Sequence, residues 1–302
     1  MALYDELDVV KKDDRGDTVK LLQAAINGWL AAAGTDDRPL AEDGDFGGGT
    51  KCYVQGFQAM HEGVNGQSLV IDGVVGAQSW FALAEYHPDI EKPALIPEAV
   101  AIGALAPLSQ QQMIDRLPGI ETSAGPLAHA ALVKAASQIG VRETGGRNLG
   151  PEVEQYQRGP ASHNGATGNA WCASFVSWCY WQAATELGAS NPLNYTASSR
   201  NIETQMDRSG RFFKIESTAD LTQIKPGDIL IWYRCGKLND SLGHVGFIHS
   251  YDRDNAELLT VEGNKLNRVY AGRYRLSDTE APKLIRGLIG FGRFTSDGVR
   301  IA

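Results

Sequence analysis

The sequence has no long apolar run, no block of basic residues and no segment typical of a signal peptide. Its net charge is −8, from 28 Lys and Arg against 36 Asp and Glu. We therefore expect no nucleic-acid partner, because phosphates bind basic surfaces. No apolar run approaches the ~20 residues of a membrane span, so we expect no membrane partner either. The start of the chain is neither basic nor apolar, which predicts synthesis in the cytoplasm without a signal peptide.

Cysteine is also scarce. The chain has Cys52, Cys172, Cys179 and Cys235. On one helix, Cys172 and Cys179 would lie ~10 Å apart along the axis, which is too far for a disulfide or for two ligands of one zinc ion. The sequence thus predicts no disulfide scaffold, and Cys179 is most simply a core residue.

A length of 302 residues favours two domains over one. Residues 1–87 contain helical patterns at 15–30, 50–60 and 79–83, and an Asp-Gly-x-x-Gly turn precedes each of the last two helices. These residues therefore predict a small module of three helices with two related loops.

The remaining chain divides at a stretch rich in proline. Residues 88–126 carry six prolines, which is typical of a linker, with short helical pieces expected at 99–106 and 109–117. In residues 127–302, helices are followed by a run of strands. This order predicts an α+β domain with an antiparallel sheet, whose strands are expected at 229–233, 243–251, 257–264 and 286–294.

The stretch from Gly168 to Cys179 is typical of a loop that runs into a helix. We expect Asn169 to be the N-cap, which would place Cys172 at the third helical position. Backbone N–H groups and the helix dipole favour a thiolate there. Cys172 is therefore a candidate nucleophile, provided that the chain supplies a base and an orienting partner.

Two later strands can supply both groups. His244 follows a glycine at the start of one apolar strand, and Glu262 and Asn264 close the next. If these strands are antiparallel neighbours, His244 lies close to Glu262 or Asn264. Side chains two residues apart share a strand face, so Glu262 and Asn264 are expected to point the same way. An acid or amide there would fix the histidine tautomer while the histidine accepts the thiol proton.

Other residues are secondary candidates. Trp171 adjoins the nucleophile and is expected to line the cleft, although packing alone would also explain it. Glu143 and Tyr156 precede the motif in segments that could reach the cleft as substrate contacts. His249 is expected in the core or on the surface, on the opposite strand face from His244, and His163 is expected in a loop.

Residues 8–86 resemble the three-helix peptidoglycan-binding module of many wall hydrolases. The resemblance rests mainly on residues that determine a fold: Gly16, Val19, Leu22, Gln23, Asp43, Gly44, Phe46, Gly47, Thr50, Val54, Phe57, Gln58, Asp72, Gly73, Val75, Gly76, Trp80 and Leu83. It implies peptidoglycan as a binding partner, while a module that acts only as a spacer or docking surface stays open.

Residues 127–294 resemble the CHAP domains of the NlpC/P60 superfamily of cysteine peptidoglycan hydrolases, which have a papain-like fold. The resemblance is carried by Trp171-Cys172-Ala173-x-Phe175-Val176, Pro226-Gly227-Asp228, Gly243-His244-Val245-Gly246 and Val261-Glu262-Gly263-Asn264.

This second resemblance implies roles for four residues. Cys172 would be the nucleophile, His244 the base, Glu262 the orienting acid and Asn264 an accessory polar group, with the backbone N–H of Cys172 as an oxyanion donor. Some phage CHAP domains bind calcium through closely spaced aspartates ahead of the cysteine. Residues 143–169 have no such run, so we expect no metal and no cofactor.

The resemblances imply an enzyme that cuts an amide bond of peptidoglycan through a thioester. The sequence leaves open an amidase, an endopeptidase, a transpeptidase, and a non-catalytic wall-binding or virion structural component. It equally leaves open a phage endolysin and an injected interbacterial toxin, which would need an immunity protein as a partner. In either setting the protein would act at the cell wall or periplasm after release or injection.

Overall fold

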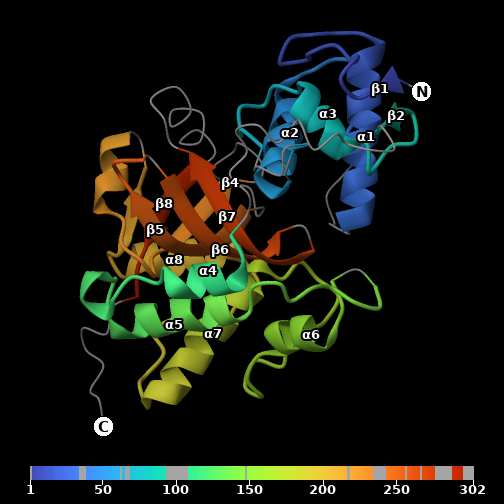
Figure 1. Cartoon of the computed structure of the whole chain (residues 1–302). Coiled ribbons are helices and arrows are strands. Elements are labelled where there is room, and N and C mark those ends of the chain that lie inside the picture. Colours follow the sequence, from blue (N-terminus) through green and yellow to red (C-terminus); the bar gives the residue numbers. More distant parts are fainter. Residues whose placement is uncertain are drawn as a thin grey trace. The chain divides into compact units, whose positions relative to one another are not determined.

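The computed structural model describes residues 2–33, 39–61, 63–64, 69–92, 108–146, 148–215, 218–233, 243–255, 257–265, 267–275 and 288–294 (Figure 1). The chain forms two compact units, which part between Pro107 and Leu108. No helix in the described segments is both long and apolar enough to cross a membrane.

The first unit is helical. Its described elements are α1 (Asp17–Ala33), α2 (Gly48–Met60), α3 (Ala77–Leu83) and a parallel pair of short strands, β1 (Ala2–Leu3) and β2 (Ile90–Glu91). The three helices correspond to those predicted from the sequence. Their inner faces share a core that includes Leu22, Phe57 and Trp80, each at most 1% exposed.

The two glycine turns of this unit are held by the same hydrogen bonds. Gln23 Oε1 accepts from the N–H of Gly44 over 2.8 Å, and Gln58 Oε1 accepts from the N–H of Gly73 over 2.9 Å. Each glutamine Nε2 also donates to the aspartate before the glycine. Both glycines have a φ of 74°, in the left-handed region that favours glycine. The sequence echo is thus a structural repeat, in which α1 holds the turn before α2 and α2 holds the turn before α3.

The second unit is α+β, as predicted. Its described helices are α4 (Gln110–Asp115), η2 (Ile120–Thr122), α5 (Pro126–Ser137), α6 (Pro151–Arg158), α7 (Cys172–Leu187), α8 (Ser199–Arg208) and η3 (Thr218–Gln223). Its described strands are β3 (Phe212–Lys214), β4 (Ile229–Tyr233), β5 (Gly243–Asp252), β6 (Glu257–Lys265), β7 (Arg268–Arg275) and β8 (Leu288–Gly292). They form one antiparallel sheet in the order β3-β8-β4-β5-β6-β7.

The predicted strands are all present as β4, β5, β6 and β8, whereas β3 and β7 were not predicted. The sequence of β7, which reads RVYAGRYR, alternates poorly and contains glycine and alanine, both depleted in strands. Tertiary pairing with β6 makes it a strand, and this strand contributes to the site described below.

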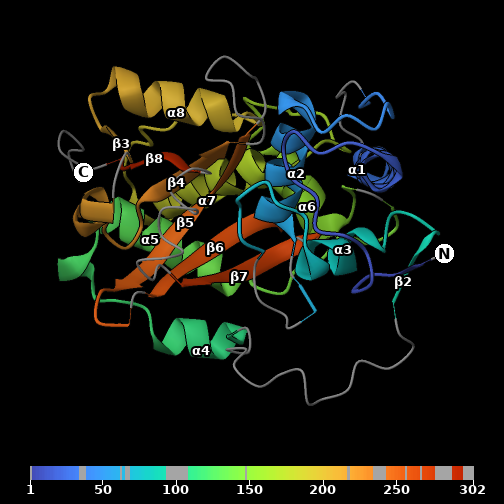
Figure 2. The same ribbon diagram turned by 90° about the horizontal axis from the view of Figure 1, so that it is seen from above.

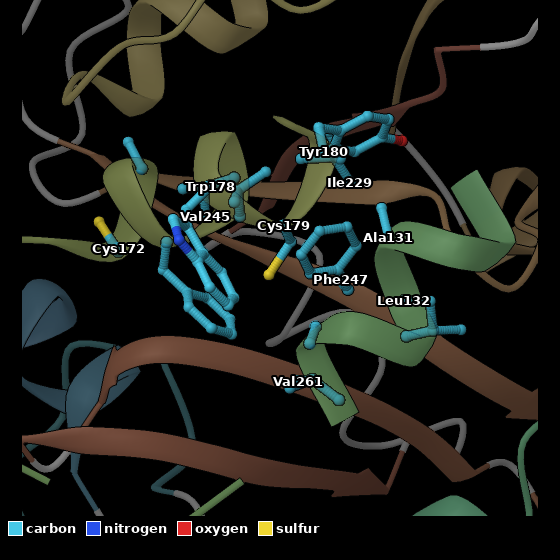
Figure 3. Packing of buried hydrophobic residues seen from close by; sticks show 14 of the residues in the cluster. Ala131, Leu132, Cys172, Trp178, Cys179, Tyr180, Ile229, Val245, Phe247 and Val261 are labelled. Carbon is cyan, nitrogen blue, oxygen red and sulfur yellow. The ribbon is translucent and has the colours of Figure 1, made fainter. Parts of the chain in front are cut away.

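Helices α5 and α7 pack together and against the sheet (Figures 1 and 2). The α7 residues Cys179 and Tyr180 lie among Leu132 from α5 and Phe247 and Val261 from the sheet (Figure 3). The Cys179 sulfur lies within this cluster, whereas the Cys172 sulfur lies at its edge (Figure 3). This packing fixes the start of α7 against strands β5 and β6.

The C-terminal half of the expected linker belongs to the second unit. Helix α4, within the piece expected at 109–117, begins at a capping box formed by Ser109 and Gln112. Met113 is fully buried, and its carbonyl oxygen lies 2.8 Å from His249 Nε2 on β5. The helical piece expected at 99–106 lies outside the described residues.

Candidate active site

Cys172 is the first residue of α7. Trp171 occupies the N-cap position, where its carbonyl accepts from the N–H of Phe175 over 2.8 Å and its side chain makes no capping hydrogen bond. The prediction that Asn169 caps this helix is therefore wrong, and Cys172 lies two positions nearer the helix start than expected. Cys172 still lies in the first turn of a helix, where the helix dipole favours a thiolate.

His244 and Glu262 form a buried pair on neighbouring strands. β5 and β6 pair in antiparallel register, with Gly246 opposite Glu262, and His244 Nε2 lies 2.8 Å from Glu262 Oε2. Both side chains are at most 1% exposed. The proximity predicted from antiparallel pairing is therefore present.

The second ring nitrogen of His244 is left for the thiol. Among the described residues, the geometry gives Nδ1 no hydrogen-bond partner, and the Cys172 thiol lies near enough to raise the pKa of the ring. Burial lowers the pKa of His244, but hydrogen bonding with Cys172 and with Glu262 outweighs it, so the pKa is raised. His244 is thus placed to hold a proton that comes from Cys172.

Glu262 is surrounded by further buried donors. Its Oε1 accepts from Thr260 Oγ1 (2.6 Å) and from the Tyr274 hydroxyl (2.7 Å), and Lys265 Nζ lies 3.5 Å away. Burial raises the pKa of Glu262, but Lys265 and His244 outweigh it and hold that pKa at about 2. Glu262 is therefore an anion with one oxygen turned to His244 and the other to these donors.

Asn264 does not follow the predicted alternation. Its φ is 59°, and the pairing of β6 with β7 shifts register between Glu262 and Lys265. This bulge breaks the period of two on which the shared face of Glu262 and Asn264 was predicted. Lys265, three residues on from Glu262, reaches its carboxylate instead. An accessory role for Asn264, which is buried, stays a prediction.

A comparison with protein families gives one match. Residues 164–264 match the family model of the CHAP domain. CHAP domains are generally cysteine and histidine amidases or peptidases that act on peptidoglycan, and the match supports a peptidoglycan hydrolase of this type. Comparison with curated proteins and with solved structures gave no match.

The match covers about a third of the chain. It includes Cys172, His244 and Glu262, and therefore the whole buried pair and the thiol beside it. The first unit lies outside it, as do Glu143 and Tyr156.

Three glycines allow close packing around β6 at Glu262 and Gly263. A Cβ at Gly246, directly across from Glu262, would lie 2.7 Å from Glu262 Cγ. A Cβ at Gly263 would lie 2.6 Å from Phe175 Cβ on α7. Outside the matched segment, a Cβ at Gly272 on β7 would collide with Thr260 Oγ1 and Glu262 Oε1. Glycine at these places lets β5, β7 and α7 close around Glu262.

Replacement of Gly272 by alanine tests this packing. We expect Gly272→Ala to destabilise the protein by about 2 kcal/mol, because overpacking a filled site costs about 1–3 kcal/mol, and to lower activity through displacement of Glu262. Gly49→Ala on α2, where no atom lies within 4 Å of the added Cβ, should not lower the unfolding midpoint, because alanine is the better helix former. Chemical denaturation followed by circular dichroism measures both, and equal midpoints would contradict the proposed collision.

The prediction that Trp171 and Tyr156 contact the substrate is wrong, because both side chains are buried. Trp171 and Tyr156 are both fully buried, so neither side chain presents a surface to a substrate. Trp171 Nε1 donates to Glu143 Oε1 (2.8 Å), and the Tyr156 hydroxyl donates to Gln138 Oε1 (2.8 Å). They support the nucleophile from inside the unit.

Glu143 is half-buried and is also engaged within the protein. Its second oxygen accepts from the N–H of Asn148 (2.7 Å), so both carboxylate oxygens hold the chain beside Trp171. This hydrogen bonding indicates a structural part for Glu143, and contact with a substrate stays a prediction.

Gln157 was not predicted, yet it anchors the loop before the nucleophile. Its Nε2 donates to the carbonyls of Asn148 (3.1 Å) and Asn169 (2.5 Å), and its Oε1 accepts from the N–H of Gly168 (3.0 Å). The side chain is 2% exposed. In the sequence, the only signal was that Gln157 is a polar residue on the same face of α6 as Val153. The groups that it binds are evident only from the fold.

The remaining histidines lie outside this arrangement. His249 is fully buried beside Met113, and burial lowers its pKa, so the expected core position is present. The His163 ring centre lies 4.6 Å from that of Tyr195, with the two rings tilted by 35°. In the described part of the chain, no cluster of three or more His, Cys, Asp or Glu could hold a metal ion.

Proposed function

We propose that the chain hydrolyses an amide bond of peptidoglycan through a thioester on Cys172. The observation that carries this proposal is the position of His244, which lies between the Cys172 thiol at the start of α7 and the buried Glu262 carboxylate.

In the proposed reaction, His244 takes the thiol proton and the sulfur attacks the carbonyl carbon. The backbone N–H of Cys172 stabilises the oxyanion. The C–N bond then breaks as His244 gives its proton to the leaving amine. Water, deprotonated by His244, finally releases the acid and restores the thiol. Glu262 orients the imidazole and stabilises its charged form throughout.

We further propose that the first unit holds the chain on the wall, on the strength of its resemblance to peptidoglycan-binding modules. Product analysis tests the cleavage and identifies the bond. Purified peptidoglycan is incubated with the full chain, and the soluble products are analysed by mass spectrometry. New L-alanine amino termini with free lactyl groups would indicate an amidase, and new termini within the stem or cross-bridge an endopeptidase.

Two other products would redirect or contradict the proposal. New cross-links would show that an amine replaces water, which indicates a transpeptidase. A chain that sediments with sacculi but releases nothing would contradict hydrolysis and favour the non-catalytic alternative.

A further inference from the structure

A fully buried lysine lies beside the active site. Lys265 Nζ donates to the Tyr274 hydroxyl over 2.5 Å and lies 3.5 Å from Glu262 Oε1. It also lies 4.6 Å from the centre of the Tyr274 ring and 5.2 Å from that of Tyr270. A buried ammonium group is costly unless an anion compensates it, and Glu262 is the anion beside it.

Glu262 therefore interacts with two basic groups. Its Oε2 faces His244 and its Oε1 faces Lys265. When Cys172 gives its proton to His244, the site holds a thiolate, an imidazolium, a carboxylate and an ammonium, whose charges sum to zero. Without Lys265 the same state would carry a net negative charge in a buried place, where the effective dielectric constant is low.

We propose that Lys265 is a positioning residue that sets the pH range in which the Cys172–His244 pair is charged. This inference rests on the proposed function for the use of the thiolate, but the charged pair itself can be measured without a substrate. Lys265 acts through Glu262, whose Oε1 lies 3.5 Å from its Nζ.

The groups that face Glu262 fix the direction of the effect. His244 on β5 faces Glu262, and the Cys172 thiol of α7 lies beyond His244. Lys265 and Thr260 on β6 and Tyr274 on β7 also face Glu262. Lys265 is the lysine in this set and brings one positive charge to it. Removing Lys265 raises the proton affinity of every acid and base nearby. The pH at which Cys172 loses its proton and the pH at which His244 loses its proton therefore both rise.

The test is the pH dependence of alkylation at Cys172. The full-length wild-type protein, Lys265→Met and Lys134→Met are treated with iodoacetamide, and the Cys172 peptide is quantified by mass spectrometry. Lys134 on α5 pairs instead with Glu186, so its variant is a matched control for the loss of one lysine. We expect the pH of half-maximal Cys172 alkylation to rise by about one unit in Lys265→Met and to stay unchanged in Lys134→Met.

Each outcome decides the proposal. Slower alkylation at every pH with an unchanged midpoint would overturn it and show a purely structural lysine. If Lys265→Met does not fold, Lys265→Gln replaces it, since glutamine keeps a hydrogen-bond donor but lacks the positive charge, and it should raise the midpoint in the same direction; no rise would again overturn the proposal.

Alkylation needs no peptidoglycan cleavage, so the two proposals can fail separately. A shifted midpoint in a protein that releases no muropeptide would retain the role of Lys265 and contradict hydrolysis. If hydrolysis holds, its pH profile in Lys265→Met should move in the same direction as the alkylation profile.

Discussion

The Cys172→Ala variant is expected to lose peptidoglycan cleavage by about 10⁴-fold or more, because a nucleophile that forms the covalent intermediate has no substitute in the site. Removal of the sulfur leaves His244 and Glu262 in place, since they are joined to each other and not through the thiol. The variant should therefore fold normally and still bind wall material through the first unit, if that unit holds the wall as proposed.

Cys179 supplies a matched control in the same helix. It lies seven residues after Cys172, is fully buried, and burial raises the pKa of its thiol, which keeps it protonated. Cys179→Ala should keep activity close to that of the wild type and lose only about 1 kcal/mol of stability. Release of soluble muropeptides from purified sacculi compares the three proteins. Equal release by Cys172→Ala and the wild type would contradict the proposed mechanism.

Glu262→Gln is expected to lose both stability and activity, for two separable reasons. The amide leaves the Lys265 ammonium buried without its anion, and breaking a buried ion pair in this way costs about 3–5 kcal/mol. Activity should fall by about 10³-fold or more, because the amide no longer stabilises the imidazolium of His244. Denaturant midpoints measure the first effect and muropeptide release the second.

The double variant Glu262→Gln with Lys265→Met separates the two effects. Without the buried ammonium, most of the lost stability should return, whereas the activity should stay low. Recovery of activity together with stability would show that Glu262 serves folding alone.

Acid denaturation measures how the ionisation of Glu262 contributes to stability. The pKa of Glu262 is about 2 in the folded protein, below its ordinary value of 4.5. Its ionisation therefore stabilises the fold fully above pH 4.5, and this contribution is lost as the pH falls towards 2. The Glu262→Gln variant should lack this part of the pH dependence.

The sequence predicted the α+β class and the elements that carry Cys172, His244 and Glu262, because each element is long and strongly patterned. Apolar runs after glycine turns are reliable signals of strands. The pairing of β5 with β6 followed from their order along the chain, since consecutive strands are usually neighbours.

The environment of Glu262 could not be predicted in the same way. Its donors Lys265 and Tyr274 depend on a bulge in β6 and on β7, a strand whose residues alternate poorly. A lysine at the end of an apolar strand is ordinarily a surface residue. Its burial follows only from the packing of β6 against β7.

Burial also decided against two predicted contacts. Trp171 adjoins the nucleophile in the chain and Tyr156 packs against Trp171, but both rings lie in the core. For Trp171, sequence proximity cannot distinguish the inner side of a helix start from its outer side when the N-cap is misplaced by two residues, as it was here.

The incorporation of α4 into the second unit limits how far the two units can separate. The last described element of the first unit is β2 (Ile90–Glu91), and the second unit begins at Leu108. The sixteen steps from Lys92 to Leu108 can span at most about 55 Å, at about 3.5 Å per residue. If the first unit is anchored to a glycan strand, as proposed, the site can reach only bonds that lie within this span extended by the dimensions of the two units. Each attachment would then permit local cleavage around one point, and more distant bonds would require the chain to detach and bind again.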